Sequence, residues 1–253
     1  MEEFTITQMQ NMVSEMLKAT IDICEKNKIT YYAQAGTVLG TIRHSGTIPW
    51  DHDADIIVPN NEIDKFVECC QNELPDKFYV DYYKVNDSTL RQFPRIGKKG
   101  FSTDVLHLDV FRLIGLPDNA DEQTAMIEEA HYYTKMNALM RKPLWKIAGK
   151  SEFLTAWRKL TNRCYYIEKF DELCNRYPYA RAKYVMNPSG KYGKKNIFEK
   201  TVYGKGILMK YENFQINVPS ETDLYLKQYY GDYMKFPPEN ETSKEMGRMY
   251  LVR

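Results

Sequence analysis

Apolar residues recur at helical spacing close to the start of the chain. They are Ile6, Met9, Val13, Met16, Leu17, Ile21 and Cys24. Residues three and four positions apart share one face of a helix. Thr5 and Gln8 precede most of this series as a T-x-x-Q capping box, in which each side chain satisfies a backbone N–H of the first turn. The pattern therefore predicts an amphipathic helix that opens the chain.

Short extended segments and helices then alternate up to residue 115. We expect strands over 29–33, 54–58, 78–83, 92–96 and 106–113. We expect helices over 37–43, after the break at Gly36, and from residue 60 or 61 to just before Pro75. Alternation of this kind predicts a mixed α/β unit.

The second half of the chain has a different pattern. Residues 118–174 are helical in periodicity, with a break around 143–150, and two short strands at 207–211 and 214–218 precede a last helix over 220–230. The polar tail after Pro237-Pro238 is expected to be partly disordered. We predict an α+β fold: a core over 1–115, and a mostly helical region over 116–253 that packs on it and could complete the substrate site.

Composition narrows the class of protein. With 253 residues, 43% of them hydrophobic, the chain can bury a sizeable core. Its 35 basic and 34 acidic residues nearly cancel, so the cationic excess typical of nucleic-acid partners is missing.

Cellular location follows from the cysteines and the first residues. The five cysteines lack a C-x-x-C pair and read as reduced thiols. The chain starts with Met-Glu-Glu instead of a basic signal sequence, and no apolar run approaches the roughly 20 residues of a membrane span. We expect a cytoplasmic protein, whose acceptor could be carried on a membrane lipid.

Acidic residues cluster in the stretch Pro49 to Ile56. Asp53 and Asp55 alternate with apolar residues and so point to one face of a strand, and Asp51 joins them if the strand begins early enough. Asp109 stands in a similar setting between Leu108 and Val110. If the two strands are neighbours, these acids form a site for Mg²⁺ or Mn²⁺, which prefer oxygen ligands.

Phosphate chemistry fits the residues before this cluster. The turn at Gly36-Thr37 opens a helix, whose first N–H groups can hold a phosphate, and Arg43 could clamp a second phosphate oxygen. Such a site can offset the charge of a transferring phosphoryl group and leave one carboxylate to accept the proton of an attacking hydroxyl.

Two other interpretations of the acids remain open. Asp51, Asp53, Asp55 and Glu62 occupy positions 1, 3, 5 and 12 of a calcium-binding loop frame, although Ile56 stands where that loop needs glycine. The cluster could also be an acidic, solvated loop without a metal.

At these residues the sequence resembles the LicD family of phosphocholine transferases, which includes the fukutin-related proteins and belongs to the nucleotidyltransferase superfamily of DNA polymerase beta type. The family pattern G-T-L-L-G-x-x-R followed by P-W-D-x-D-x-D-I is matched by Gly36 to Arg43 and by Pro49 to Ile56. Leu106 to Phe111 resembles the family's H-x-D-I-F segment, and Tyr230 to Pro238 resembles its closing Y-G-D-Y-M-x-x-P-P. The resemblance covers nearly the whole chain.

The resemblance implies a DNA polymerase beta-like nucleotidyltransferase fold with a small mixed sheet and flanking helices. It implies Mg²⁺ binding by Asp53, Asp55 and Asp109, with Asp51 as a nearby supporter, and a phosphate-facing turn at Gly36-Thr37. Family members use CDP-choline and relatives use CDP-alditols, with release of CMP. His52 departs from the pattern, since many members carry another acid there, and the tail lacks the basic and histidine residues that often follow the paired prolines.

Other residues could contact the substrate. Trp50 is either a structural wedge or a substrate wall, and His107 shares the predicted face of Asp109 but could equally be a half-buried structural side chain. The lysine-rich patch from Lys191 to Lys205 is either a solvated loop or a contact for pyrophosphate or an anionic glycan. We expect the segment from Tyr230 to Tyr233 to pack under the site.

We therefore expect a phosphotransferase that moves phosphocholine, or glycerol- or ribitol-phosphate, from a CDP-linked donor to a sugar hydroxyl of a cell-surface glycan. The pathway could build teichoic acid, capsule or lipopolysaccharide. One alternative is a nucleotidyltransferase that uses a nucleoside triphosphate and releases pyrophosphate. Another is a non-catalytic module that binds a nucleotide or glycan.

Overall fold

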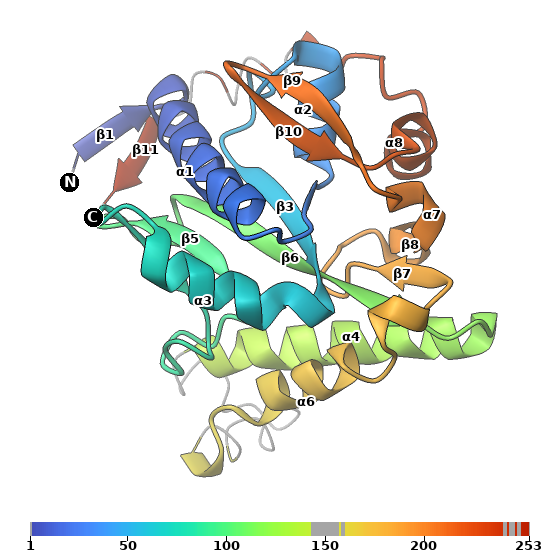
Figure 1. Ribbon diagram of the computed structural model, residues 1–253. Coiled ribbons are helices and arrows are strands. Elements are labelled where there is room, and N and C mark those ends of the chain that lie inside the picture. Colours follow the sequence, from blue (N-terminus) through green and yellow to red (C-terminus); the bar gives the residue numbers. More distant parts are fainter. Residues whose placement is uncertain are drawn as a thin grey trace.

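The computed structural model describes residues 2–142, 157, 160–239, 242, 246 and 249–252 (Figure 1). Its helices are α1 (Ile6–Lys26), α2 (Gly36–His44), α3 (Ile63–Glu73), α4 (Ala120–Arg141), α6 (Tyr165–Cys174), α7 (Lys200–Tyr203) and α8 (Thr222–Tyr230), with 3-10 turns at Asn60–Glu62, Tyr179–Arg181 and Gly193–Asn196. Its strands are β1 (Glu2–Thr5), β2 (Tyr32–Ala33), β3 (Ala54–Pro59), β4 (Phe78–Asp81), β5 (Arg95–Lys98), β6 (His107–Leu116), β7 (Tyr184–Met186), β8 (Ile197–Glu199), β9 (Ile207–Tyr211), β10 (Phe214–Val218) and β11 (Met249–Val252).

A mixed sheet lies at the centre of the molecule. Its strands run in the order β2-β3-β6-β5-β4, and β7 pairs with the far end of β6 and with β8. The β3–β6 pair is parallel, whereas the other pairs are antiparallel. Two antiparallel pairs lie outside the sheet, the β9–β10 hairpin and β1 with β11. The long strand β6 is therefore shared by the first and second halves of the chain.

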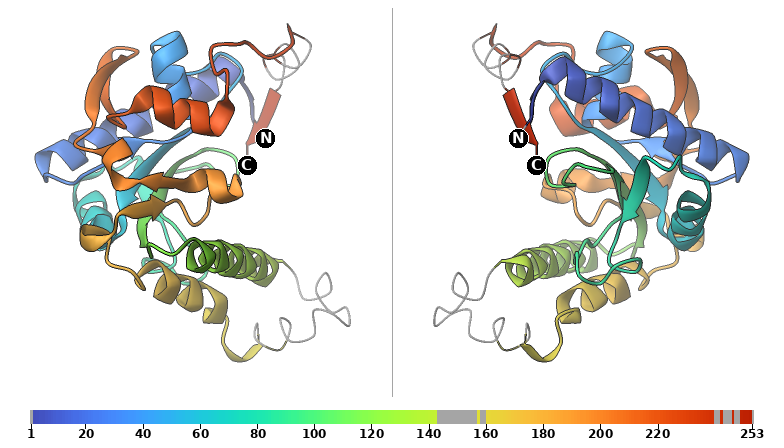
Figure 2. Two further views of the ribbon diagram at one scale, coloured as in Figure 1. Left: turned by 90° about the vertical axis from the view of Figure 1, so that its right-hand side faces the viewer. Right: turned by 90° about the vertical axis from the view of Figure 1, so that its left-hand side faces the viewer.

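Helices cover the sheet and close its core. The predicted apolar face of α1 is buried and, with α3, packs beside the sheet (Figure 1). At the other end of the molecule α4 and α6 lie side by side and enclose a cluster with Ile114, Leu116 and Met186 of β6 and β7 (Figure 2). The main core contains buried residues from Ile6 to Tyr229, so both halves of the chain contribute to it.

The predicted α+β class, with a mixed sheet and flanking helices, is confirmed. The capping box is present, since Thr5 Oγ1 accepts from the Gln8 N–H at 3.3 Å and the Thr5 N–H donates to Gln8 Oε1 at 2.8 Å. The hairpin strands have the predicted bounds. The sequence pattern missed β7 and β8, which return to the sheet after the expected boundary at residue 115, and it missed β11 in the tail. The expected break at 143–150 lies outside the described residues.

No helix in the described ranges combines the length and the apolar character that a membrane crossing would need.

Candidate active site

A cavity of about 780 Å³ opens where the acid-bearing strands meet the start of α2. Asp109 and Phe111 of β6 lie at its floor. One wall comes from Gln34, Ala35, Gly36, Leu39, Arg43, Ile48, Trp50, Asp51, Asp53 and Asp55. The other wall comes from the loop after β7, from the 3-10 turn Gly193–Asn196, and from the last residue of α8 with the segment that follows it. Their lining residues are Asn187, Ser189, Gly190, Lys191, Tyr192, Asn196, Tyr230, Asp232, Tyr233, Lys235, Phe236, Pro237 and Pro238.

Three of the predicted acids face this cavity together. Asp55 and Asp109 are direct partners in the parallel β3–β6 pair, so their side chains leave the sheet on one face. Asp53 stands two residues before Asp55, and all three line the cavity. Asp53 is exposed, Asp55 is half-buried and Asp109 is buried. The sheet therefore assembles carboxylates that are distant in sequence.

Asp51 lines the same cavity and lies next to Asp53. Its Oδ1 accepts the His52 N–H at 3.0 Å, and a Cβ added to Gly36 would lie 3.3 Å from its Oδ2. The loop that carries it is held by Gln10 of α1, whose Nε2 donates to the Asp51 carbonyl at 2.7 Å and to the Ile48 carbonyl at 3.1 Å. Asp51 thus packs against the glycine that begins α2.

Burial and repulsion between carboxylates raise the pKa of Asp51, Asp55 and Asp109. Burial and the Asp53 charge raise the pKa of Asp51 to about 7. Burial, Asp53 and Asp109 raise the pKa of Asp55 well above its usual value. Burial raises the pKa of Asp109 to about 6 even though Arg95 opposes the shift. A cation among these groups would relieve the repulsion.

Arg95 is a neighbour of the cluster that the sequence analysis did not assign. It pairs with Asp109 in the antiparallel β5–β6 register, and its Nε lies 2.6 Å from Asp109 Oδ1. His107 Nε2 lies 3.5 Å from the same oxygen, and burial followed by the Arg95 charge lowers the pKa of His107 to about 4. His107 is therefore neutral near pH 7, and it does not line the cavity.

Two hydrogen bonds join the turn before α2 to β3. Gln34 N–H donates to the Asp55 carbonyl at 2.9 Å, and Asp55 N–H donates to Thr37 Oγ1 at 2.8 Å. Gly36 lines the cavity, whereas Thr37 is buried behind it. The Thr37 hydroxyl therefore anchors β3, and of the predicted pair it is Gly36 that faces the cavity.

Ala35 in this turn has a backbone conformation that L-residues rarely adopt, with φ 44° and ψ −111°. Such strain costs about 1–3 kcal/mol and persists when neighbouring contacts enforce it. Here the Ala35 N–H donates to Tyr225 Oη at 2.9 Å, and Tyr225 Oη donates to Gln34 Oε1 at 2.8 Å. Gln34 also reaches Tyr229, which donates to Asn196 Oδ1 at 3.1 Å. A buried chain from α8 thus fixes the turn.

Arg43 is packed between aromatic rings on the cavity wall. Its guanidinium carbon lies 5.5 Å from the Trp50 ring centre and 4.8 Å from that of Phe236, and its Nη1 donates to the Tyr233 carbonyl at 3.1 Å. This contact ties the segment after α8 to α2. The predicted role of Arg43 as a phosphate clamp would have to use its remaining N–H groups.

The loop after β7 forms the facing wall. Within the stretch 191–205, all of it described, Lys191 is the lysine that lines the cavity. Tyr192 lies beside it, with its ring 6.1 Å from that of Tyr230 at an interplanar angle of 79°. The segment from Tyr230 to Tyr233, expected under the site, instead supplies part of the wall.

The residues present suit a metal that also binds substrate oxygens. Within the described ranges, no group of three or more His, Cys, Asp or Glu side chains is placed to hold an ion unaided. Mg²⁺ commonly takes one or two protein carboxylates plus substrate phosphates, so the acids of β3 and β6 remain suitable ligands. The calcium-loop alternative is wrong, because the acids lead into β3 and Glu62 Oε2 accepts the Thr30 N–H at 2.9 Å.

A match to a family model shows which protein family the chain belongs to. The family model described as "LicD/FKTN/FKRP, nucleotidyltransferase domain" matches residues 28–157, just over half of the chain. The chain belongs to the LicD family. Membership of this family makes it a transferase of phosphorus-containing groups.

One curated relative carries the LicD name, and it aligns with almost the whole chain. The lipopolysaccharide cholinephosphotransferase LicD of Haemophilus influenzae is 26% identical over 257 aligned positions, which cover 95% of this chain and 96% of that protein. An uncharacterized protein of Rickettsia prowazekii is 44% identical over 50 residues, 19% of each chain. The near-complete coverage of the first relative extends the match over both halves of the fold.

Among solved structures, terminal uridylyl transferase 4 from Trypanosoma brucei with bound CTP is 12% identical. The match covers 63% of this chain and 50% of that one, with a TM-score of 0.25. A likeness of this size carries no argument about the site.

Proposed function

We propose that the protein moves phosphocholine from a CDP-linked donor to a sugar hydroxyl of a cell-surface glycan, with Mg²⁺ as its metal and Mn²⁺ as an alternative. Glycerol- or ribitol-phosphate is the alternative group. The observation that carries this proposal is the row of Asp55 and Asp109 on neighbouring strands, joined by Asp53, at the floor of one cavity.

The donor would lie between the two walls. Its diphosphate would meet the N–H groups at the start of α2, where a helix favours negative charge, and Lys191 on the opposite wall. Asp53, Asp55 and Asp109 would hold the metal together with phosphate oxygens, and Asp51 would support them. The metal would offset the charge that develops on the transferring phosphoryl group.

Aromatic lining favours choline as the transferred group. The rings of Tyr192 and Tyr230 meet at a steep angle in the cavity wall, and Asp232 lies nearby in sequence and in the lining. A quaternary ammonium is attracted by ring faces and by a carboxylate, whereas an alditol would need hydrogen-bonding partners. The cholinephosphotransferase relative fits the same choice.

The chemical step would be a single displacement at phosphorus. The acceptor hydroxyl oxygen forms a bond to the phosphorus that carries choline, and the bond from that phosphorus to the bridging oxygen breaks. CMP leaves with the bridging oxygen, and a carboxylate of the cluster accepts the hydroxyl proton. An acceptor carried on a lipid would bring the protein to a membrane surface.

The products of turnover test this function. Incubation with CDP-choline, Mg²⁺ and a candidate glycan should release CMP in step with phosphocholine transfer, and Asp55→Asn should abolish both. Release of pyrophosphate from a nucleoside triphosphate, without CMP from any CDP-linked donor, would instead support the nucleotidyltransferase alternative. A folded wild type that turns over neither type of donor would favour the non-catalytic module.

A further inference from the structure

Among the ion pairs found in the described part of the chain, that of Arg95 with Asp109 is the shortest one at the acid cluster. In the β5–β6 register Arg95 stands directly opposite Asp109, just as Asp55 does on the other side of β6. Its Nε lies 2.6 Å from Asp109 Oδ1, and its Nη2 donates to Asp109 Oδ2 at 3.4 Å. The Nε–Oδ1 contact is an ion pair without hydrogen-bond geometry, so the guanidinium lies against one carboxylate oxygen and donates a long hydrogen bond to the other.

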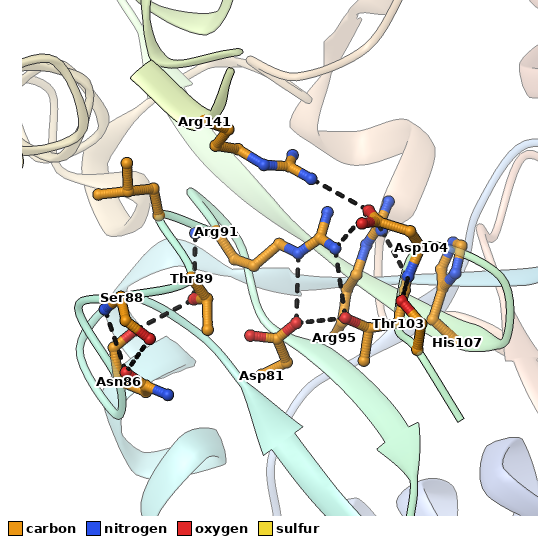
Figure 3. Close-up of polar contacts among 12 residues, drawn as sticks. Asp81, Asn86, Ser88, Thr89, Arg91, Arg95, Thr103, Asp104, His107 and Arg141 are labelled. Atoms are coloured by element: carbon orange, nitrogen blue, oxygen red, sulfur yellow. Dashed lines mark hydrogen bonds and ion pairs between the residues drawn. The ribbon is translucent and has the colours of Figure 1, made fainter. Parts of the chain in front are cut away.

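A network of polar side chains and one backbone carbonyl also holds this guanidinium (Figure 3). Arg95 Nη1 donates to the Thr103 carbonyl at 2.8 Å. The Thr103 hydroxyl donates to Asp81 Oδ2 and accepts from Arg91 Nη2 at 3.2 Å. Arg91 Nη2 also donates to Asp104 Oδ1 at 2.6 Å. Arg95 is therefore fixed between the carboxylate of β6 and the loop that joins β5 to β6.

We propose that Arg95 is a positioning residue, which orients the Asp109 carboxylate for the metal. The inference rests on the proposed function, because it concerns the same metal. A carboxylate offers about four lone-pair sites, so Asp109 can keep Arg95 and still accept a cation from the cavity. Groups that hydrogen-bond to a metal-ligating side chain commonly contribute 10–100-fold to metal affinity.

Charge and orientation predict opposite effects when Arg95 is replaced. A guanidinium near the metal repels it, so loss of the positive charge alone would tighten metal binding. Loss of the ion pair at Oδ1 and of the hydrogen bond at Oδ2 would let the carboxylate rotate and would weaken binding. Arg95→Lys keeps the charge and removes the planar fork, whereas Arg95→Met removes both. The pair of variants therefore separates the two effects.

Titration of Mn²⁺ in the presence of saturating CDP, followed by the electron paramagnetic resonance signal of free Mn²⁺, tests the role. We expect Arg95→Lys to weaken Mn²⁺ binding at least about 10-fold, and Arg95→Met to weaken it as well. In turnover assays, kcat of Arg95→Lys should fall and should recover as Mg²⁺ is raised, because excess metal compensates for lost affinity.

Arg112→Lys is the matched control. Arg112 lies on β6 and pairs with Asp171 at 2.7 Å, away from the acid cluster, so its replacement should leave Mn²⁺ affinity unchanged. Wild-type affinity in Arg95→Lys, or tighter binding in Arg95→Met, would overturn the positioning role alone. Absence of Mn²⁺ binding to the folded wild type would instead overturn the metal site of the proposed function.

Discussion

Asp53 is the exposed member of the acid row, and its charge acts on its neighbours. It raises the pKa of Asp51, Asp55 and Asp109, beside the larger effect of burial. Asp53→Asn removes this repulsion and one of the proposed metal ligands without changing the shape of the side chain. We expect turnover to fall at least about 100-fold, with a melting temperature equal to or above that of the wild type.

Melting temperatures without metal and initial rates with Mg²⁺ check this prediction. The two measurements should move independently, because the substitution affects the chemistry and not the packing. Full activity in Asp53→Asn would remove Asp53 from the metal site, whereas a large loss of stability would make it a structural residue.

Lys191 and Lys194 allow a comparison between a lysine in the cavity wall and a lysine outside it. Lys191 lines the cavity, whereas Lys194, also exposed and close in sequence, does not. Lys191→Ala should raise KM for the donor about 10-fold, since a charge-assisted contact to phosphate contributes roughly 1.5–3 kcal/mol. Lys194→Ala should leave KM unchanged. Equal effects of both substitutions would mean that the lysines act through general surface charge.

A site residue could be predicted from the sequence where the pattern that marks it lies within one short segment. Alternation along one strand is enough to place Asp53 and Asp55 on a common face, because the side-chain period of a strand is a local property. Asp109 joins them only on the further assumption that its strand lies beside theirs, which the structure confirms. Arg95 carries no such local signal, because it reaches the site through strand register. The lysine-rich patch is visible in the sequence, but only the structure shows that Lys191 is the lysine of that patch that lines the cavity.

Among the elements, α8 supports the turn at Gln34-Ala35-Gly36, although α8 belongs to the second half of the chain. Tyr225→Phe removes the hydroxyl that joins Ala35 to Gln34 and leaves a donor and an acceptor without this partner. We expect a loss of about 1–3 kcal/mol in unfolding free energy and a higher KM for the donor. Chemical denaturation and steady-state kinetics measure the two effects.

Tyr32→Phe is the matched control for this element. Tyr32 also buries its ring, and its hydroxyl donates to the Gly204 carbonyl at 2.6 Å, away from the cavity. Its replacement should lower stability while KM stays at the wild-type value. A KM effect of equal size in Tyr32→Phe would show that the turn responds to general loosening instead of to Tyr225.

Elements with a strong local pattern were predictable, and short ones that depend on partners were not. The periodicity and capping box of α1, and the two strands of the β9–β10 hairpin, are visible in the sequence. β7 and β8 are three residues long each, and they are strands because β6 extends far enough to pair with β7. No window of that length carries a reliable period.

At the scale of the whole molecule, the cavity joins the two halves of the sequence. The acids and the turn come from residues before 115, whereas Lys191, Tyr192 and the wall from Tyr230 to Pro238 come from the second half. The resemblance to LicD proteins predicted the fold and grouped the acids into one site. It did not predict which residues of the second half form the other wall, because their position depends on how the chain returns to the sheet at β7. Donor binding should therefore need both walls and the metal together.

The most direct test is the heat of binding of CDP-choline, CDP-ribitol and CDP-glycerol, each measured with Mg²⁺ and again after chelation. We predict binding of CDP-choline that depends on Mg²⁺ and is lost with the chelator, with weaker binding of the two alditol donors. Binding that is unaffected by chelation, or no binding of any donor by the folded protein, would contradict the account of a metal-dependent CDP-donor phosphotransferase.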